Sequence, residues 1–142
     1  MPIYRSEAGD AALVSLEPDT DLLEGLLAAA KDLDMRAGWI QVIGAAKRLA
    51  YGVYDQETQE YRTFEEEGQF EIAAAMGNVS LKDGDPFVHL HIVATRHDGS
   101  AIGGHLMPGT TVFVAEAWLQ RLASETVPVR EMDERRGLAL WR

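Results

Sequence analysis

Turn motifs at short, regular intervals are the feature of this sequence that most restricts its fold. They fall at Asp83-Gly84-Asp85-Pro86, at Asp98-Gly99 and at Pro108-Gly109. Glycine, proline and aspartate in such clusters are typical of hairpin turns. Segments rich in strand-forming residues lie before and between these turns, at 70–72, 79–81, 87–93 and 111–114. The second half of the chain is therefore predicted to form a mostly antiparallel sheet.

The first half adds a helix and further strands. Asp21 followed by Glu24 resembles a capping box, and leucine and alanine then recur at helical spacing as far as Leu33. Strands are predicted at 12–16, 39–43, 49–54 and 61–64, with a turn at Gly44 to Arg48 and another at 55–58. The predicted fold class is α+β, a mostly antiparallel sheet with one or two packed helices in a single domain over residues 1–142.

Composition excludes several classes of function. The 142 residues include no cysteine, so disulfides and thiolate zinc sites are ruled out and a metal would need nitrogen or oxygen ligands. No apolar run is long enough to span a bilayer, and no signal peptide is recognised, which indicates a cytoplasmic protein. The net charge of −10 disfavours nucleic acid as a partner. The densest basic clusters are Lys47-Arg48 and Arg130 with Arg135-Arg136, and acidic neighbours dilute the second.

Three histidines are the strongest candidates for a functional site. His89 and His91 are two residues apart on a predicted strand, so both side chains lie on one face, with Cα atoms roughly 6.5 to 7 Å apart. If His97-Asp98-Gly99 forms a three-residue turn, Arg96 pairs with Ser100 and His91 faces His105. Opposed residues are close enough for both imidazoles to reach one ion. The pattern predicts a three-histidine site for a divalent metal, with zinc as the favoured ion.

Two alternatives stay open at this point. A two-residue turn at Asp98-Gly99 would place His105 opposite Ile92 and turn it to the other face. A bulge at Gly103-Gly104 would also shift the pairing register, so that His105 would no longer face His91. Histidines on strands are also often hydrogen-bonded structural residues, and His97 in the turn is expected to be a solvated loop residue.

Two glutamates are candidates for proton transfer if the site is catalytic. Glu116 lies in the otherwise apolar segment 114–118, where a carboxylate is costly unless it is paired or binds a metal. A hairpin through Pro108-Gly109 would leave it about two pairs along from His105. Glu71, between Phe70 and Ile72, is a similar candidate. The alternative for both residues, which the sequence favours, is an ion pair with an arginine or an exposed edge position.

The order and spacing of the motifs resemble those of the plants and prokaryotes conserved (PPC) domain over residues 11–123. The matching motifs are Phe70-Glu71-Ile72, Met76-Gly77-Asn78-Val79, Pro86-Phe87, His89-Leu90-His91, Asp98-Gly99, Gly103-Gly104-His105-Leu106, Gly109 and Ala115-Glu116. The resemblance implies an α+β fold and a homotrimer, in the stand-alone prokaryotic form. It also implies a metal site at the three histidines, which plant members generally lack.

The family is commonly labelled DNA-binding because its plant members carry AT-hooks. This chain has no Arg-Gly-Arg-Pro core and is strongly acidic, so the label is not expected to apply to it. Two functions are predicted: a trimeric regulatory or ligand-binding metal module, and alternatively a metal-dependent enzyme of hydrolase or lyase type. Phe113, Trp118 and Leu119 make their strand apolar on both faces, as expected either of a strand buried between subunits or of one packed in the core of the subunit.

Overall fold

The structure is a computed structural model that describes residues 4–123 and 126–141. Its strands and helix are, in chain order, β1 (Glu7–Leu16), α1 (Leu22–Asp32), β2 (Gly38–Asp55), β3 (Glu60–Lys82), β4 (Asp85–Arg96), β5 (Ala101–Leu106), β6 (Thr111–Ala123), β7 (Arg130–Asp133) and β8 (Leu138–Trp141). The α+β prediction is confirmed: an antiparallel sheet dominates, with one helix in the described part of the chain. No helix among these residues is both long enough and apolar enough to cross a bilayer.

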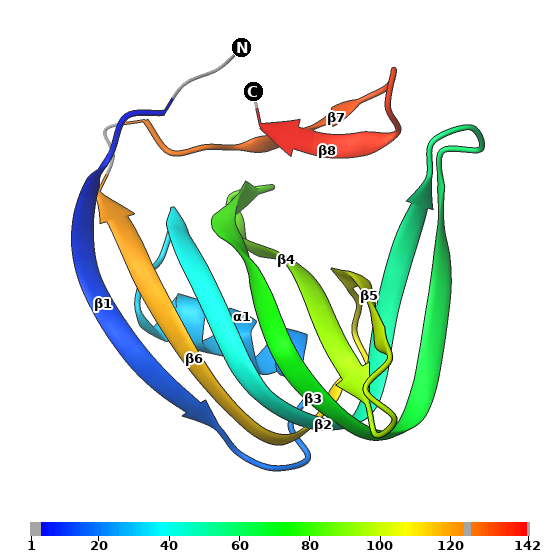
Figure 1. The fold of residues 1–142 in the computed structure, drawn as a ribbon. Helices are drawn as coiled ribbons and strands as arrows, with labels where there is room; N and C mark the ends of the chain where they lie inside the picture. The colour runs from blue at the N-terminus through cyan, green and yellow to red at the C-terminus, as the bar shows by residue number, and fades with distance from the viewer. Residues whose placement is uncertain (1–3, 124–125, 142) are drawn as a thin grey trace.

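Six strands form one curled sheet in the order β1-β6-β2-β3-β4-β5. The end of β2 also pairs with β5, through Tyr51 with Leu106 and Gly52 with His105. This second pairing closes β2, β3, β4 and β5 into a ring. Figure 1 shows the long β2–β3 hairpin bending upward on one side of this ring, with the separate β7–β8 hairpin lying across its open end.

Helix α1 covers one face of the sheet. The Asp21 side chain accepts a hydrogen bond from the Glu24 backbone N–H at 3.0 Å, so Asp21 caps the start of the helix, as predicted. Leu22, Leu26 and Ala30 of the helix are fully buried against the sheet. The hydrophobic core therefore lies between α1 and the sheet. The opposite face, called the open face below, carries no helix among the described residues, and β7 contacts one end of it through Arg130 (Figure 1).

The predicted turn at Gly44 to Arg48 is wrong, because the chain continues as strand through this region. Gly44 and Lys47-Arg48 lie inside β2, where the register shifts between Val42 and Gly44 and again between Ala46 and Arg48. These irregularities are bulges, which bend a strand without ending it. Likewise the separate strands expected at 61–64, 70–72 and 79–81 are one strand, β3, which also includes 73–76.

The expected hairpin through Pro108-Gly109 is also wrong. β5 and β6 do not pair with each other; β6 crosses the sheet to lie between β1 and β2. Leu22 N–H donates to Thr110 O at 2.9 Å, and Val112 N–H donates to Thr20 O at 3.0 Å. The connection is thus held by the start of α1, and β6 pairs with residues 38–48 of β2, whereas β5 pairs with the same strand at Tyr51 and Gly52.

Candidate metal centre

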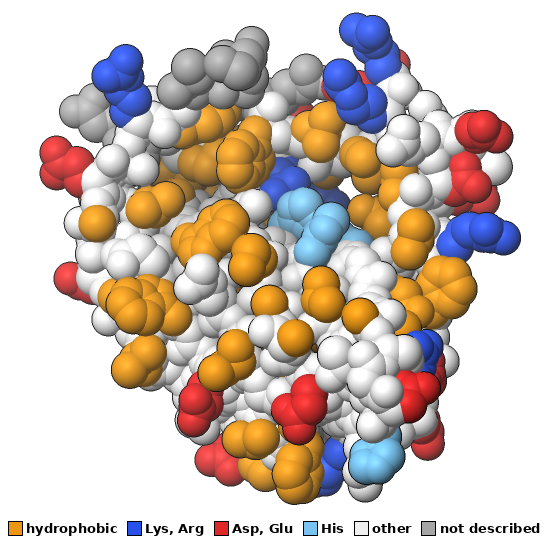
Figure 2. Space-filling model, in the orientation of Figure 1, with side chains coloured by type: hydrophobic (Ala, Val, Ile, Leu, Met, Phe, Trp, Pro, Cys, Tyr) orange, Lys and Arg blue, Asp and Glu red, His pale blue; other side chains and the backbone are white. Residues whose placement is uncertain are grey.

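The three predicted histidines lie together on the open face of the sheet. On β4 the residues Val88, Leu90 and Ile92 are buried toward the helix, so His89 and His91 project from the other face. His105 comes from the neighbouring strand β5. Figure 2 shows histidine side chains near the middle of this face, next to basic atoms and bordered by hydrophobic side chains.

The turn between β4 and β5 has the geometry that this arrangement requires. Arg96 N–H donates to Ser100 O at 3.0 Å, Gly99 N–H donates to Arg96 O at 2.9 Å, and Gly99 has φ +83°. This is the three-residue turn, and His91 pairs with His105. The pairs Ile92–Gly104 and Val93–Gly103 keep the same register, so the double glycine adds no bulge. The two alternatives, a two-residue turn and a register shifted by a bulge at the double glycine, are therefore wrong. His97 is exposed at the turn, as expected.

One ring nitrogen from each histidine lies within 4.8 Å of the others. The ring centroids are 4.9 Å apart for His89 and His105, 5.3 Å for His89 and His91, and 5.7 Å for His91 and His105. Within residues 4–123 and 126–141 this is the single group of three or more histidines, aspartates or glutamates close enough to hold an ion.

Burial favours the neutral form of His89 and His105. Desolvation, with smaller contributions from neighbouring positive charge, lowers the pKa of His89 to about 4 and that of His105 to about 4. Neutral imidazole is the form that binds a metal. The Nδ1 atom of His105 is buried and has no hydrogen-bond partner. A metal ion would use a lone pair that is otherwise buried at a cost, so the residues fit a bound ion.

Two glycines let β5 approach closely enough to bring His105 to the other histidines. A Cβ on Gly104 would lie 2.4 Å from the carbonyl oxygen of Gly52 in β2, and a Cβ on Gly103 would lie 1.9 Å from that of Ile92 in β4. No other residue fits between these backbones without moving them. The double glycine therefore holds β5 between β2 and β4.

Arg130 and Tyr61 also border the site, and sequence analysis did not assign them to it. Arg130, at the start of β7, is 8% exposed, and its Nη2 lies 3.2 Å from Nδ1 of His89. An arginine can only donate, so this contact requires an unprotonated Nδ1 on His89. The ring of Tyr61 in β3 lies 5.0 Å from that of His105, and burial raises the pKa of the Tyr61 hydroxyl. In the sequence Arg130 stands in one basic cluster with Arg135-Arg136, which are exposed, and its place directly after the apolar segment 127–129 is the signal that it is buried.

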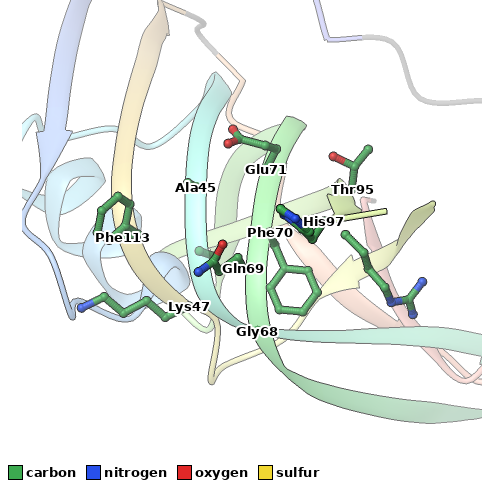
Figure 3. A pocket seen from close by; sticks show the side chains of 11 residues that line it. Ala45, Lys47, Gly68, Gln69, Phe70, Glu71, Thr95, His97 and Phe113 are labelled. Atoms are coloured by element: carbon green, nitrogen blue, oxygen red, sulfur yellow. The ribbon is translucent and has the colours of Figure 1, made fainter. Parts of the chain in front are cut away.

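The two candidate glutamates lie elsewhere on the sheet. Glu116 is exposed and pairs in register with Ile43 of β2 and Ser15 of β1. Glu71 is exposed at another position, where it lines a pocket of about 500 Å³ with Lys47 and His97 (Figure 3). Neither carboxylate belongs to the histidine group. Glu116 is far from it because β6 does not pair with β5.

Comparison with known proteins gives the family. A sequence model described as the Plants and Prokaryotes Conserved (PCC) domain, also written PPC, matches residues 4–123. The chain belongs to the PPC family. The match begins before residue 11, so it extends the resemblance seen in the sequence and confirms it. No curated protein matches this PPC chain.

Solved structures of archaeal and bacterial proteins share the fold. A metal-containing protein from Archaeoglobus fulgidus is 36% identical, with a TM-score of 0.94 over 100% of this PPC chain and 99% of the other. A PPC protein from Pyrococcus horikoshii is 34% identical, with a TM-score of 0.93 over 100% and 97% of the two chains. A protein from Bacteroides thetaiotaomicron, described as a candidate DNA-binding protein, is 26% identical, with a TM-score of 0.86 over 99% and 98%.

Proposed function

We propose that this PPC-domain protein is a cytoplasmic regulatory or ligand-binding module that holds one divalent metal ion on His89, His91 and His105. The observation that carries the proposal is the convergence of three ring nitrogens within 4.8 Å, together with the buried Nδ1 of His105 that has no partner. The metal content of the Archaeoglobus fulgidus relative, which has the same fold, supports it.

Zinc is the ion we propose. Imidazole nitrogen suits zinc, and a zinc site with three protein ligands keeps a fourth position for water or an exogenous ligand. When bound, the ion would supply Lewis acidity and a place for that ligand. The chain itself supplies three imidazoles fixed on two paired strands, with Arg130 and Tyr61 beside them.

Equilibrium dialysis of chelator-treated protein against zinc tests the site. We expect about one zinc per chain in the wild type. The His105→Ala variant should lose most of this binding, whereas the matched variant His97→Ala, which removes the exposed turn histidine, should keep it. Equal zinc binding by the His105→Ala and His97→Ala proteins would contradict the proposal.

We also propose that the chain forms a homotrimer through the open face of the sheet. One row of paired residues crosses all six strands there: Leu13, Trp118, Gln41, Met76, His91 and His105. Leu13 is 83% exposed, Trp118 49% and Met76 46%. An apolar surface of this kind is characteristic of an interface between subunits. Of the three residues of β6 considered in the sequence, Phe113 and Trp118 are exposed, and Leu119 is buried in the core.

A metal-dependent enzyme of hydrolase or lyase type is the second candidate. The charged side chain of Arg130 beside the histidines favours it, because a guanidinium next to a metal can stabilise developing negative charge. Glu71 and Glu116 would move protons in such an enzyme only from a neighbouring subunit. A crystal structure of the oligomer with the Glu116 carboxylate near the three histidines would support this function, and separation of the two in that structure would oppose it.

Nucleic acid is the least supported partner. The description of the Bacteroides thetaiotaomicron relative favours it, but a net charge of −10 opposes attraction to phosphate. We therefore expect no salt-dependent shift of duplex DNA in a gel assay. A shift that weakens steeply with added salt would favour the DNA-binding function instead.

A further inference from the structure

Arg130 is a buried cation without an acidic partner in the described residues. Its Nε donates to Ser80 Oγ at 2.8 Å, its Nη1 to Ala139 O at 3.0 Å, and its Nη2 to Asn78 Oδ1 at 2.9 Å. All three acceptors are neutral. No aspartate or glutamate within 4–123 or 126–141 forms an ion pair with it. A buried charge is costly unless an opposite charge compensates it, so Arg130 is poised for an anion that the chain does not provide.

The guanidinium is held firmly in this position. Its centre lies 5.1 Å from the centroid of the Phe87 ring and 5.7 Å from that of Trp141. The β7–β8 hairpin that carries it is tied to the tip of the β2–β3 hairpin, where Gln59 Nε2 donates to Arg135 O at 2.9 Å and the Tyr54 hydroxyl donates to Arg136 O. A donor fixed in this way binds a ligand without first losing side-chain freedom.

Metal binding would change the contact between Arg130 and His89. In the metal-free protein Nδ1 of His89 accepts from Nη2 of Arg130. A neutral imidazole has one nitrogen with a lone pair and one with a proton. If the ion binds Nδ1, the lone pair of Nδ1 coordinates the ion. If the ion binds Nε2, the ring proton must reside on Nδ1. In both cases Nδ1 stops accepting from Arg130, and one guanidinium N–H is released beside the ion.

The same event increases the positive charge of the site. A divalent ion would add its charge next to a guanidinium that already has no counterion among the described residues. Both changes favour an anion. The rings of Tyr61, Phe87 and Trp141 border the site and provide apolar surface for the organic part of such a ligand.

We propose that the metal centre binds a small organic carboxylate, held jointly by the open coordination position of the ion and by the guanidinium of Arg130. Arg130 is an anion-binding residue whose donor becomes available when the metal binds. The inference rests on the proposed three-histidine metal site and names the class of ligand that this site takes. Because the two ligands favour each other, each should tighten the binding of the other by the same factor.

Cobalt-substituted protein with acetate as the probe tests the inference. The visible spectrum of bound Co²⁺ should change when acetate is added and should stay unchanged with acetamide, which has the same shape and no charge. Acetate should also tighten cobalt binding by the wild type, a measurement that needs no variant. Arg130→Gln should weaken the acetate response on the order of tenfold or more, the loss expected when a charged hydrogen bond to a ligand is removed. Arg130→Lys keeps the charge and should recover part of the response.

The matched control is Arg135→Gln. It lies on the same hairpin, changes the charge equally, and is exposed, with contacts made by its backbone. It should respond to acetate as the wild type does. Cobalt binding in each variant confirms that the histidine site has folded, and Arg130→Gln should bind cobalt at least as tightly as the wild type when no anion is present.

Distinct results would overturn distinct claims. A wild-type cobalt spectrum that acetate leaves unchanged, or an equal response in the Arg130→Gln protein, would overturn the anion site and leave the metal site standing. A response to inorganic phosphate without one to acetate would overturn the carboxylate class. Failure of the wild type to bind cobalt at all would overturn the metal site and the anion site together.

Discussion

His91 and His105 lie directly opposite each other in the register of β4 and β5, and the three-residue turn at 97–99 fixes that register. Deleting His97 would leave a two-residue turn and move His105 to the other face of the sheet. We expect zinc affinity to fall at least about tenfold in this deletion variant. His97→Ala, which keeps the length of the turn, should bind zinc as the wild type does. Unchanged affinity in the deletion variant would show that the register does not assemble the site.

Gly104 should be intolerant of any side chain. A Cβ there would meet Gly52 O at 2.4 Å, so Gly104→Ala must push β5 away from β2. We expect a loss of about 1 to 3 kcal/mol in the free energy of unfolding, and weaker zinc binding because His105 moves with its strand. Denaturant titration and zinc dialysis measure the two effects. Ala101→Ser, at an exposed position of the same strand, should change stability by less than about 0.5 kcal/mol.

The metal-free protein should lose stability as the pH falls from about 6.5 to about 4. The pKa of His89 and of His105 is about 4 in the folded protein, whereas an unfolded histidine titrates near 6.5. Between these pH values the two histidines bind protons in the unfolded chain but not in the folded chain. Protonation therefore favours unfolding as the pH falls. Thermal melting of chelator-treated protein across this range should show the decrease.

The control for this pH effect is the double variant His89→Gln, His105→Gln. Carboxylates also titrate toward the acid end of the range, so the informative quantity is the difference between the two proteins. The melting temperature of the double variant should depend less on pH than that of the wild type. Identical pH profiles would contradict the assignment of the effect to these histidines.

The open face of the sheet should control the oligomeric state. Leu13→Glu places a charge on a residue that is 83% exposed and lies next to Trp118. The folded subunit should tolerate it, while a trimer formed through this face should dissociate. Light scattering should give the mass of three chains for the wild type and a smaller mass for the variant. Met132→Glu makes the same kind of change on β7, at a residue that is 64% exposed, and should leave the trimer intact.

The sequence predicted the local features of the fold better than its pairing. The helix start at Asp21 and the turn at 97–99 depend on neighbouring residues, and both were correct. The sequence indicates one turn from Gly44 to Arg48, where the structure has two bulges, because glycine and a charged pair occur both in turns and in bulges. A bulge differs from a turn here because β2 continues to pair with β3 and β6 before and after each irregularity. Those pairings involve residues distant in the sequence, so they could not be predicted from the local pattern.

The candidate site shows the same division. The proximity of His89, His91 and His105 could be predicted from the sequence, because one short turn sets the register of the two strands that carry them. The contact of Arg130 with His89 could not be predicted in this way, because the two residues are 41 positions apart in the sequence and lie on different hairpins. Glu116 was placed too near the histidines because β5 and β6 were expected to form a hairpin, whereas β6 pairs with β1 and β2.

Elemental analysis of untagged protein as purified, beside the double variant His89→Ala, His91→Ala, tests the central claim most directly. The wild type should contain close to one divalent metal ion per chain, with zinc as the main element. The double variant, prepared in the same way and confirmed to be folded by circular dichroism, should contain almost none. Equal metal content in the two proteins would contradict the account.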